Sequence, residues 1–137
     1  MSFELREHTA DVAVAARGGT LGEAFAAVAD GLAAAMCDEI PQTGGERHDV
    51  AVRAEDRESL LFDYLDELIY RRDVEAVLPV DHEANVEASG ETWRLTGSFR
   101  GVPLEDVVAR DVKAVTYSEM RIEREGETWT AYVVLDV

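Results

Sequence analysis

The chain has 137 residues, of which 47% are apolar, with 29 acidic and 13 basic side chains and a formal net charge of −16. This length suits one domain with one sizeable core, because two independent cores would each be marginal. The charge balance excludes broad binding to nucleic acid, since a phosphate backbone is held by a basic surface that releases counterions.

The acidic residues are scattered along the chain, and Lys113 is the one lysine among the 13 basic residues. Such a composition is typical of halophile-like proteins, whose self-repulsion is screened by high salt. The N-terminal sequence has no export signal, and no apolar stretch is long enough to span a bilayer. Cys37 is the single cysteine, which excludes an internal disulfide and favours a small buried side chain. We therefore expect a cytoplasmic protein without membrane contacts.

Two segments have the apolar spacing of helices. Thr20 followed by Glu23 forms a capping box, and apolar residues then recur at helical spacing from Leu21 to Met36. The second segment, residues 55–72, has acidic residues in its first turn and arginines in its last, as the helix dipole favours. Its apolar stripe consists of Leu60, Leu61, Tyr64, Leu65, Leu68 and Ile69.

Most other segments alternate apolar and polar residues as strands do. Strands are predicted at residues 2–6, 12–16, 49–53, 74–80, 85–88, 93–99, 112–117, 120–124 and 128–136, with loops at 38–47 and 100–110. A turn at Glu125-Gly126 would join the last strands as a hairpin. The pattern predicts an α+β fold, with a largely antiparallel sheet covered by two main helices in a single domain of residues 1–137.

Signatures of common phosphate-binding and hydrolytic enzymes are absent. The sequence contains no GxxxxGK[ST] loop, GxGxxG fingerprint, GxSxG elbow or HExxH helix. His48 and His82 stand in polar stretches without a Cys or His at metal-ligand spacing. We predict that both histidines are ordinary surface residues.

Polar residues at the two ends of the chain could meet at a cation. Asp11, in His8-Thr9-Ala10-Asp11, either caps its own turn or serves as a metal ligand. The Asp136 side chain and the Val137 α-carboxylate are adjacent anions on a predicted strand, although a final strand commonly frays into solvent. If that strand lies beside Asp11, the three carboxylates would suit calcium or magnesium, which bind oxygen. Spacing alone leaves both readings open.

Lys113 is unusual in a chain that otherwise uses only arginine as its basic residue. It lies in the predicted strand at 112–117. An ammonium on a flexible stem can reach a phosphate or tune a neighbouring carboxylate in ways that a planar guanidinium cannot. Retention by chance explains a single lysine as well.

Taken together, these segments resemble the archease family. The resemblance rests on Phe3-Glu4, His8-Thr9-Ala10-Asp11-Val12, Thr20-Leu21-Gly22-Glu23-Ala24-Phe25, the helix pattern from Glu58 to Leu68, Val112-Lys113-Ala114-Val115-Thr116-Tyr117 and the closing Val133 to Val137. It runs from the first strand to the last residue. HTAD, KAVTY and a terminal Asp-Val, in this order, are more specific together than any one of them alone.

The resemblance implies a protein that is not an enzyme and activates an RtcB-type RNA ligase, which joins tRNA halves in tRNA splicing. It would promote the GTP-dependent guanylylation of the ligase and its multiple turnover. The implied metal ligands are Asp11, Asp136 and the terminal carboxylate of Val137, with calcium favoured and magnesium or manganese as alternatives. Lys113 would act at the ligase contact, and His8 would orient Asp11 by donating a hydrogen bond to it without binding the metal itself.

The sequence departs from the family pattern at Ser118, where the family often has histidine. A chaperone or specificity modulator of an RNA-modifying enzyme, such as a tRNA methyltransferase, is the alternative function. That role would use an exposed apolar groove and no metal. A small metal-dependent hydrolase is a third reading, for which His8 is the only candidate base.

Overall fold

A computed structural model describes residues 1–8 and 11–137, except for the side chains of Glu7 and His8. Its elements in chain order are β1 (Ser2–His8), β2 (Asp11–Gly18), α1 (Leu21–Met36), β3 (Glu46–Ala54), α2 (Arg57–Glu75), β4 (Val77–Ser89), β5 (Thr92–Pro103), the short 3₁₀ helix η1 (Leu104–Asp106), β6 (Ala114–Glu125) and β7 (Thr128–Asp136). Among these residues, no helix is long and apolar enough to cross a membrane.

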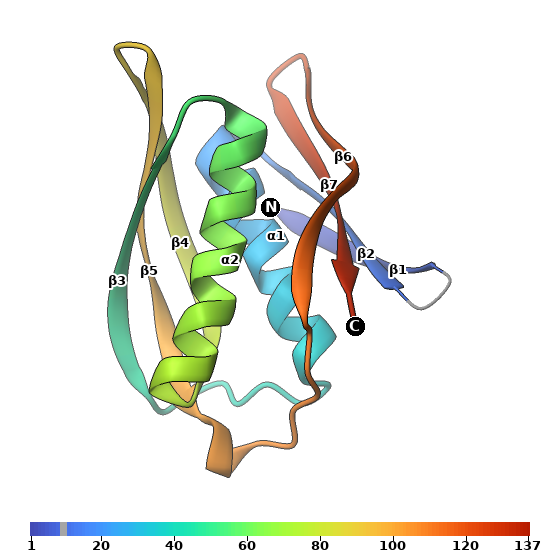
Figure 1. Ribbon diagram of the computed structural model, residues 1–137, viewed down its shortest axis with the longest axis vertical. Helices are drawn as coiled ribbons and strands as arrows, with labels where there is room; N and C mark the ends of the chain where they lie inside the picture. The colour runs from blue at the N-terminus through green and yellow to red at the C-terminus, as the bar shows by residue number, and fades with distance from the viewer. Residues whose placement is uncertain (9–10) are drawn as a thin grey trace.

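The strands form a first sheet in the order β1-β2-β7-β6 and a second sheet in the order β3-β5-β4. All described strand pairs are antiparallel, which confirms the predicted α+β class. The predicted antiparallel strands are thus divided between two sheets, and the helices lie between them (Figure 1). Helix α1 packs on β2 and β4, and α2 packs on β3 and β6, so each helix joins the two sheets.

Helix α1 begins at the predicted residue, because the Thr20 hydroxyl accepts a hydrogen bond from the Glu23 backbone N–H at 3.1 Å. The helix is buried on nearly every side, which its many alanines and glycines allow. A Cβ at Gly31 would lie 2.4 Å from Cγ1 of Val14, so only glycine permits this close approach to β2. This contact also shows that Val14 points inward, toward the helix.

Helix α2 is capped by Asp56, whose carboxylate accepts a hydrogen bond from the Ser59 N–H at 2.7 Å. It continues through residues 74 and 75, which were predicted to begin a strand. The helix ends at Ala76, whose φ of 54° is left-handed. Val74 is an exposed residue of this helix, with 61% of its surface accessible, so the apolar side chain that suggested a buried strand lies in neither a strand nor the core.

Strands β4, β5 and β6 are longer than their alternation predicts. β4 joins the predicted strands 74–80 and 85–88 through a bulge between Val80 and Glu83. β5 extends through Pro103, where residues 100–110 were predicted to be a loop, because its end still pairs with β3 and β4. A bulge between Thr116 and Arg121 likewise makes one strand of β6, and the predicted β6–β7 hairpin is confirmed.

The core lies between the sheets and is completed by the apolar faces of both helices. Cys37 is 2% exposed, as predicted for a small buried side chain. Because Val14 points inward, strand alternation places Asp11, Ala15 and Arg17 on the opposite face of the first sheet. This outer face is turned away from the helices and carries the residues discussed below.

Candidate metal centre

Asp11 and Asp136 lie opposite each other on neighbouring strands. Asp11 is the first residue of β2, Asp136 is the last of β7, and the two are direct partners in the antiparallel register. Side chains in such positions share a face of the sheet, with Cβ atoms about 4.5–5.5 Å apart. The end of β7 pairs with the start of β2 (Figure 1), and this register brings the two predicted aspartates together. Val137 follows directly and is 38% exposed.

The carboxylates of this pair lack a compensating cation in the described part of the chain. Neither Asp11 nor Asp136 forms an ion pair or side-chain hydrogen bond with a described residue. Like charges directly opposite each other on a sheet are destabilising. An arrangement of this kind favours a bound cation, because a cation would remove that repulsion.

Lys113 lies beside the carboxylate pair. Its backbone N–H donates a hydrogen bond to the Asp136 carbonyl at 2.8 Å, and the next residue, Ala114, is the register partner of Asp136. The prediction that Lys113 belongs to a strand is wrong, since β6 begins at Ala114. Val112 is fully buried and anchors the segment, whereas Lys113 itself is exposed and accessible to a partner.

His8 and Ser118 have different relations to this pair. His8 is the register partner of Asp11 at the end of β1, but its side chain lies outside the described residues, so its predicted role stays a prediction. Ser118 is exposed and belongs to the bulge of β6, four residues beyond Ala114. Extended chain of that length covers about 13 Å, so Ser118 stands apart from Asp136.

A conventional side-chain metal cluster does not occur in the described residues. No three Asp, Glu, His or Cys side chains among them come together in a way that could hold an ion. The predicted site differs in its third donor, which is the α-carboxylate of Val137. Two aspartates and a terminal carboxylate give an all-oxygen set, the chemistry preferred by calcium and magnesium.

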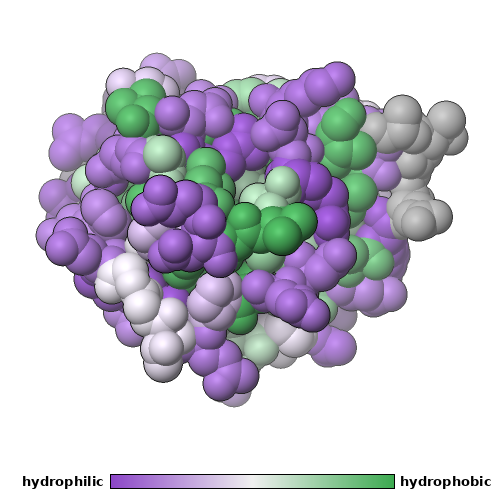
Figure 2. All heavy atoms as spheres, turned by 90° about the horizontal axis from the view of Figure 1, so that it is seen from below, coloured by the Kyte–Doolittle hydropathy of each residue, from purple (hydrophilic) through white to green (hydrophobic). Residues whose placement is uncertain are grey.

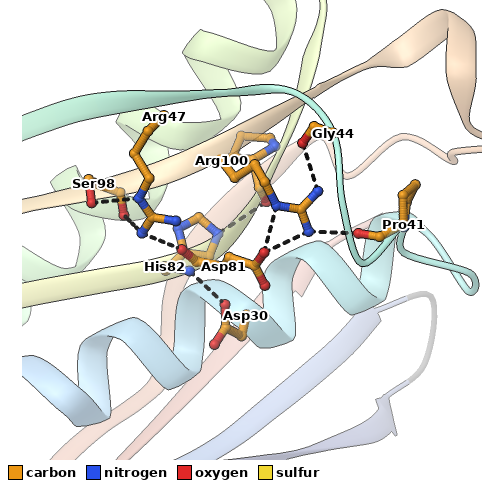
Figure 3. Close-up of polar contacts among 9 residues, drawn as sticks. Asp30, Pro41, Gly44, Arg47, Asp81, His82, Ser98 and Arg100 are labelled. Carbon is orange, nitrogen blue, oxygen red and sulfur yellow. Dashed lines mark hydrogen bonds and ion pairs between the residues drawn. The ribbon is translucent and has the colours of Figure 1, made fainter.

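A second polar group consists of Asp30, Arg47, Asp81, His82 and Arg100 (Figure 3), and we call it the buried polar cluster after His82, its one buried member, since Arg47 and Asp81 are exposed. His82 is 4% exposed, so its predicted surface position is wrong. The His82 backbone N–H donates to the Asp30 carboxylate at 3.1 Å, and its Nε2 lies 3.1 Å from the Pro79 carbonyl. The spacing of Val80, His82 and Ala84 was the signal for a buried face, which the polar neighbours of His82 obscured.

Burial shifts both titratable groups at the centre of this cluster. It raises the pKa of Asp30 to about 6, against the opposing effect of the hydrogen bond from His82. It lowers the pKa of His82 to about 4, because the charged imidazole would lose its hydration. Nδ1 of His82 is buried and has no hydrogen-bond partner among the described residues.

Arginines connect the buried polar cluster to its surroundings. Arg47 donates to the Asp81 carbonyl at 2.6 Å and to the Ser98 hydroxyl at 3.0 Å. Arg100 pairs with the Asp81 carboxylate at 2.6 Å and donates to the carbonyls of Pro41 and Gly44 at 2.6 and 2.9 Å. The cluster thereby fixes the loop after α1 to β4 and β5. These contacts join separate elements of the fold, which is a structural role.

The fold and the carboxylate pair first define the class: a small α+β protein whose antiparallel sheets enclose its helices and whose strand ends present acidic oxygens. Comparison with known proteins is more specific, because residues 3–137 match the model of the archease protein family. The chain is 37% identical to the archease of Thermococcus gammatolerans and 35% identical to that of Pyrococcus furiosus, with 98% of each chain covered in both comparisons. The chain belongs to the archease family.

Solved structures agree with this assignment. The solution structure of a Methanobacterium thermoautotrophicum protein matches with a TM-score of 0.86 and 32% identity over 99% of each chain. A crystal structure from Thermotoga maritima, described as an archease and possible chaperone, matches with a TM-score of 0.64 over 98% of this chain and 96% of that one. At 21% identity, this second structure supports the fold alone.

Proposed function

We propose that this archease is a non-catalytic activator of an RtcB-type tRNA-splicing ligase in the cytoplasm, promoting GTP-dependent guanylylation and multiple turnover. The observation that supports the proposal most is the register pairing of Asp11 with Asp136, beside the backbone of Lys113. Asp11 near the start of the chain, Lys113 in the loop before β6 and Asp136 near the end of the chain are thus neighbours in the structure. These are also the residues that the resemblance to the family singles out.

The donor set fits a divalent cation. Asp11, Asp136 and the α-carboxylate of Val137 would hold it, and a cation there would offset the repulsion between opposed carboxylates. A bound calcium would supply a compact positive charge at an otherwise acidic surface. The chain's own contribution is to place the carboxylates on strands, where the sheet register fixes their separation.

Contact with a protein partner is favoured over contact with RNA. The chain carries a net charge of −16, which opposes a long phosphate backbone. Lys113 is exposed beside the carboxylate pair, so its ammonium can reach an anionic group of the ligase or of a nucleotide held by the ligase. In this proposal the ligase binds the RNA, and the activator binds only the ligase.

The test is a ligation assay with limiting RtcB-type ligase from the same organism, run with wild-type protein, Asp11→Asn and Asp66→Asn. Asp66 is an exposed aspartate on α2 and serves as the matched control. We expect many turnovers with wild type and Asp66→Asn, and about one turnover or fewer per ligase with Asp11→Asn, because the amide removes one negative charge from the ligand set and so lowers its affinity for calcium. Lys113→Met should retain metal binding and lose stimulation.

Two results would contradict the proposal. Equal stimulation by wild type and Asp11→Asn would show that the activation of the ligase does not need the carboxylate pair. If the folded wild-type protein gave no stimulation at any of several salt concentrations, it would not be an activator of this ligase. A metal-binding measurement on the same samples separates these failures, because the metal site and the ligase contact are assessed independently.

A chaperone role for RNA-modifying enzymes is a second candidate, favoured by exposed apolar residues at one end of the molecule. Val108 is 93% exposed and, with Val107 and Cys37, lines a hollow of about 410 Å³ whose other lining includes Asp38 and Asp106. Figure 2 shows this end, where apolar side chains gather amid hydrophilic ones.

The two candidate functions respond differently to substitution. Val108→Ser should reduce the suppression of aggregation of a tRNA methyltransferase and leave ligase stimulation unchanged. Asp11→Asn should do the opposite. A Val108→Ser protein that suppresses aggregation as well as wild type would discard the chaperone role at this surface.

A further inference from the structure

The outer face of the first sheet contains a hollow that lies away from the carboxylate pair. Its volume is about 560 Å³, within the range of small-molecule sites. Strands β1, β2, β6 and β7 all contribute to it. We call it the arginine hollow because Arg6, Arg17 and Arg121 line it, together with Thr130 and Tyr132.

The sheet register places the arginines of this hollow around one residue, Ala15. Ala15 lies between Glu4 on β1 and Tyr132 on β7, and Tyr132 in turn lies beside Arg121 on β6. Standard strand spacings put the Cα atoms of Arg17, Arg6 and Arg121 about 7, 8 and 10 Å from that of Ala15. Long side chains reach across such distances, so all these guanidinium groups can meet above the small Ala15 side chain.

The arginines are only weakly engaged with protein groups. Arg6 lies 3.5 Å from Glu4, and Arg121 lies 3.9 Å from Glu123, with more than half of each side chain exposed. Exposed pairs of this kind contribute little stability, so an incoming dianion can displace them. Arg17 is exposed and has no hydrogen bond or ion pair with any described residue.

An aromatic ring and a hydroxyl complete the hollow. The Arg121 guanidinium carbon lies 4.6 Å from the centre of the Tyr132 ring, a stacking contact that holds the guanidinium over the sheet. Thr130 is the register partner of Arg17 and therefore shares its face. Guanidinium forks match phosphate oxygens in pairs, and a neighbouring hydroxyl can donate to a further oxygen.

From this arrangement we infer that the arginine hollow binds the phosphoryl group of a small molecule of mononucleotide size. Its described charged lining, Arg6, Arg17 and Arg121 against Glu4 and Glu123, carries one net positive charge (3 − 2), whereas the whole chain carries −16. A small phosphate ester can enter such a local positive spot, but a long polyanion would meet the acidic surroundings. The inference does not depend on the ligase role, because none of the proposed metal ligands lines the hollow.

The test follows the amide signals of the full-length ¹⁵N-labelled protein by NMR during titration with ADP, inorganic phosphate or adenosine, at about 0.1 M salt. ADP and phosphate should shift signals around Ala15, and adenosine should not. Arg17→Gln should weaken ADP binding about tenfold, because a charged hydrogen bond is lost. Arg121→Gln should weaken it as well.

Arg53→Gln is the matched control, since Arg53 is exposed on β3 of the other sheet. It should leave ADP binding unchanged, and the dispersion of each spectrum verifies that the variant is folded. Equal weakening of ADP binding by Arg53→Gln would show that only the net charge of the protein matters, and it would overturn the proposal. Shifts caused equally by adenosine, or tighter binding of a single-stranded RNA oligomer than of ADP at the same residues, would also overturn it.

Discussion

The buried polar cluster and the carboxylate pair are both built from acidic side chains on strands or helices, but they differ in how the charge is compensated. Asp30 is partly buried and accepts a hydrogen bond from His82, and Asp81 pairs with Arg100. Asp11 and Asp136 stand opposite each other at strand ends without an ion pair to a described residue. The carboxylates of the first arrangement have partners within the protein, whereas those of the second would gain one from a bound cation.

This difference shows why a shifted pKa alone is a poor guide to function. Burial moves the pKa of Asp30 to about 6 and that of His82 to about 4, values that often accompany active sites. Their partners nevertheless fix a loop to a sheet. The carboxylate pair is recognised instead by register, by like charge and by its place at the surface.

The largest expected effect concerns Arg100, the most connected residue of the buried polar cluster. Its side chain is 12% exposed and binds Asp81 and the carbonyls of Pro41 and Gly44. Arg100→Met should lower the free energy of unfolding by about 3 kcal/mol, because these acceptors lose their donor. Urea denaturation measures this loss. The control Arg94→Met, on the same strand with an exposed pair to Glu87, should cost less than about 1 kcal/mol.

The next effect is the pH dependence that Asp30 imposes. Its pKa in the folded protein, about 6, exceeds the ordinary value of 3.8, so the stability from its protonated form is complete below pH 3.8 and is lost as the pH rises through 6. Asp30→Asn should therefore gain about 1 kcal/mol over wild type above pH 6, a figure reduced for partial exposure, and no such advantage near pH 4. Unfolding at about pH 4, 6 and 7.5 measures it. A difference that is constant with pH would contradict the assignment.

His82 should have the opposite dependence. Its pKa in the folded protein, about 4, lies below the ordinary 6.5, so its contribution to stability is present above pH 6.5 and is lost as the pH falls through 4. His82→Gln should flatten the acid side of the stability profile. Wild type and variant can be compared in the same urea series. Parallel profiles between pH 4 and 6.5 would show that His82 gains its proton as readily in the folded protein as in the unfolded chain.

The smallest effect should change sign with metal. In a chelator, Asp11→Asn should raise the free energy of unfolding by about 0.2–1 kcal/mol, because it removes a like-charge contact with Asp136. In excess calcium, wild type should instead be the more stable protein, since a ligand of the folded state stabilises it. Thermal unfolding under both conditions measures the reversal. The absence of a reversal would argue against a metal at this pair.

The sequence predicted correctly those elements that begin or end because of contacts between residues close together in the chain. The Thr20 cap places the start of α1, and the Glu125-Gly126 turn joins β6 to β7. Alternation predicted β7 because the strand has no bulge in its register with β2. In these cases, the side chains that decide the structure are close in the chain.

Long-range contacts decide what the sequence did not predict. The division of the strands into two sheets depends on α1 and α2 each having partners on both sides. The burial of His82 depends on a bulge in β4 and on Asp30, 52 residues away. The meeting of Asp11 with Asp136 likewise depends on sheet order, so the residues alone left it open and the family resemblance supplied it.

The comparison between the carboxylate pair and the buried polar cluster is tested most directly by calorimetric titration of calcium into wild type, Asp11→Asn and Asp30→Asn. The account predicts one calcium per chain for wild type and Asp30→Asn, and a large loss of affinity for Asp11→Asn. Calcium binding that survives in Asp11→Asn, or that is lost in Asp30→Asn, would contradict it.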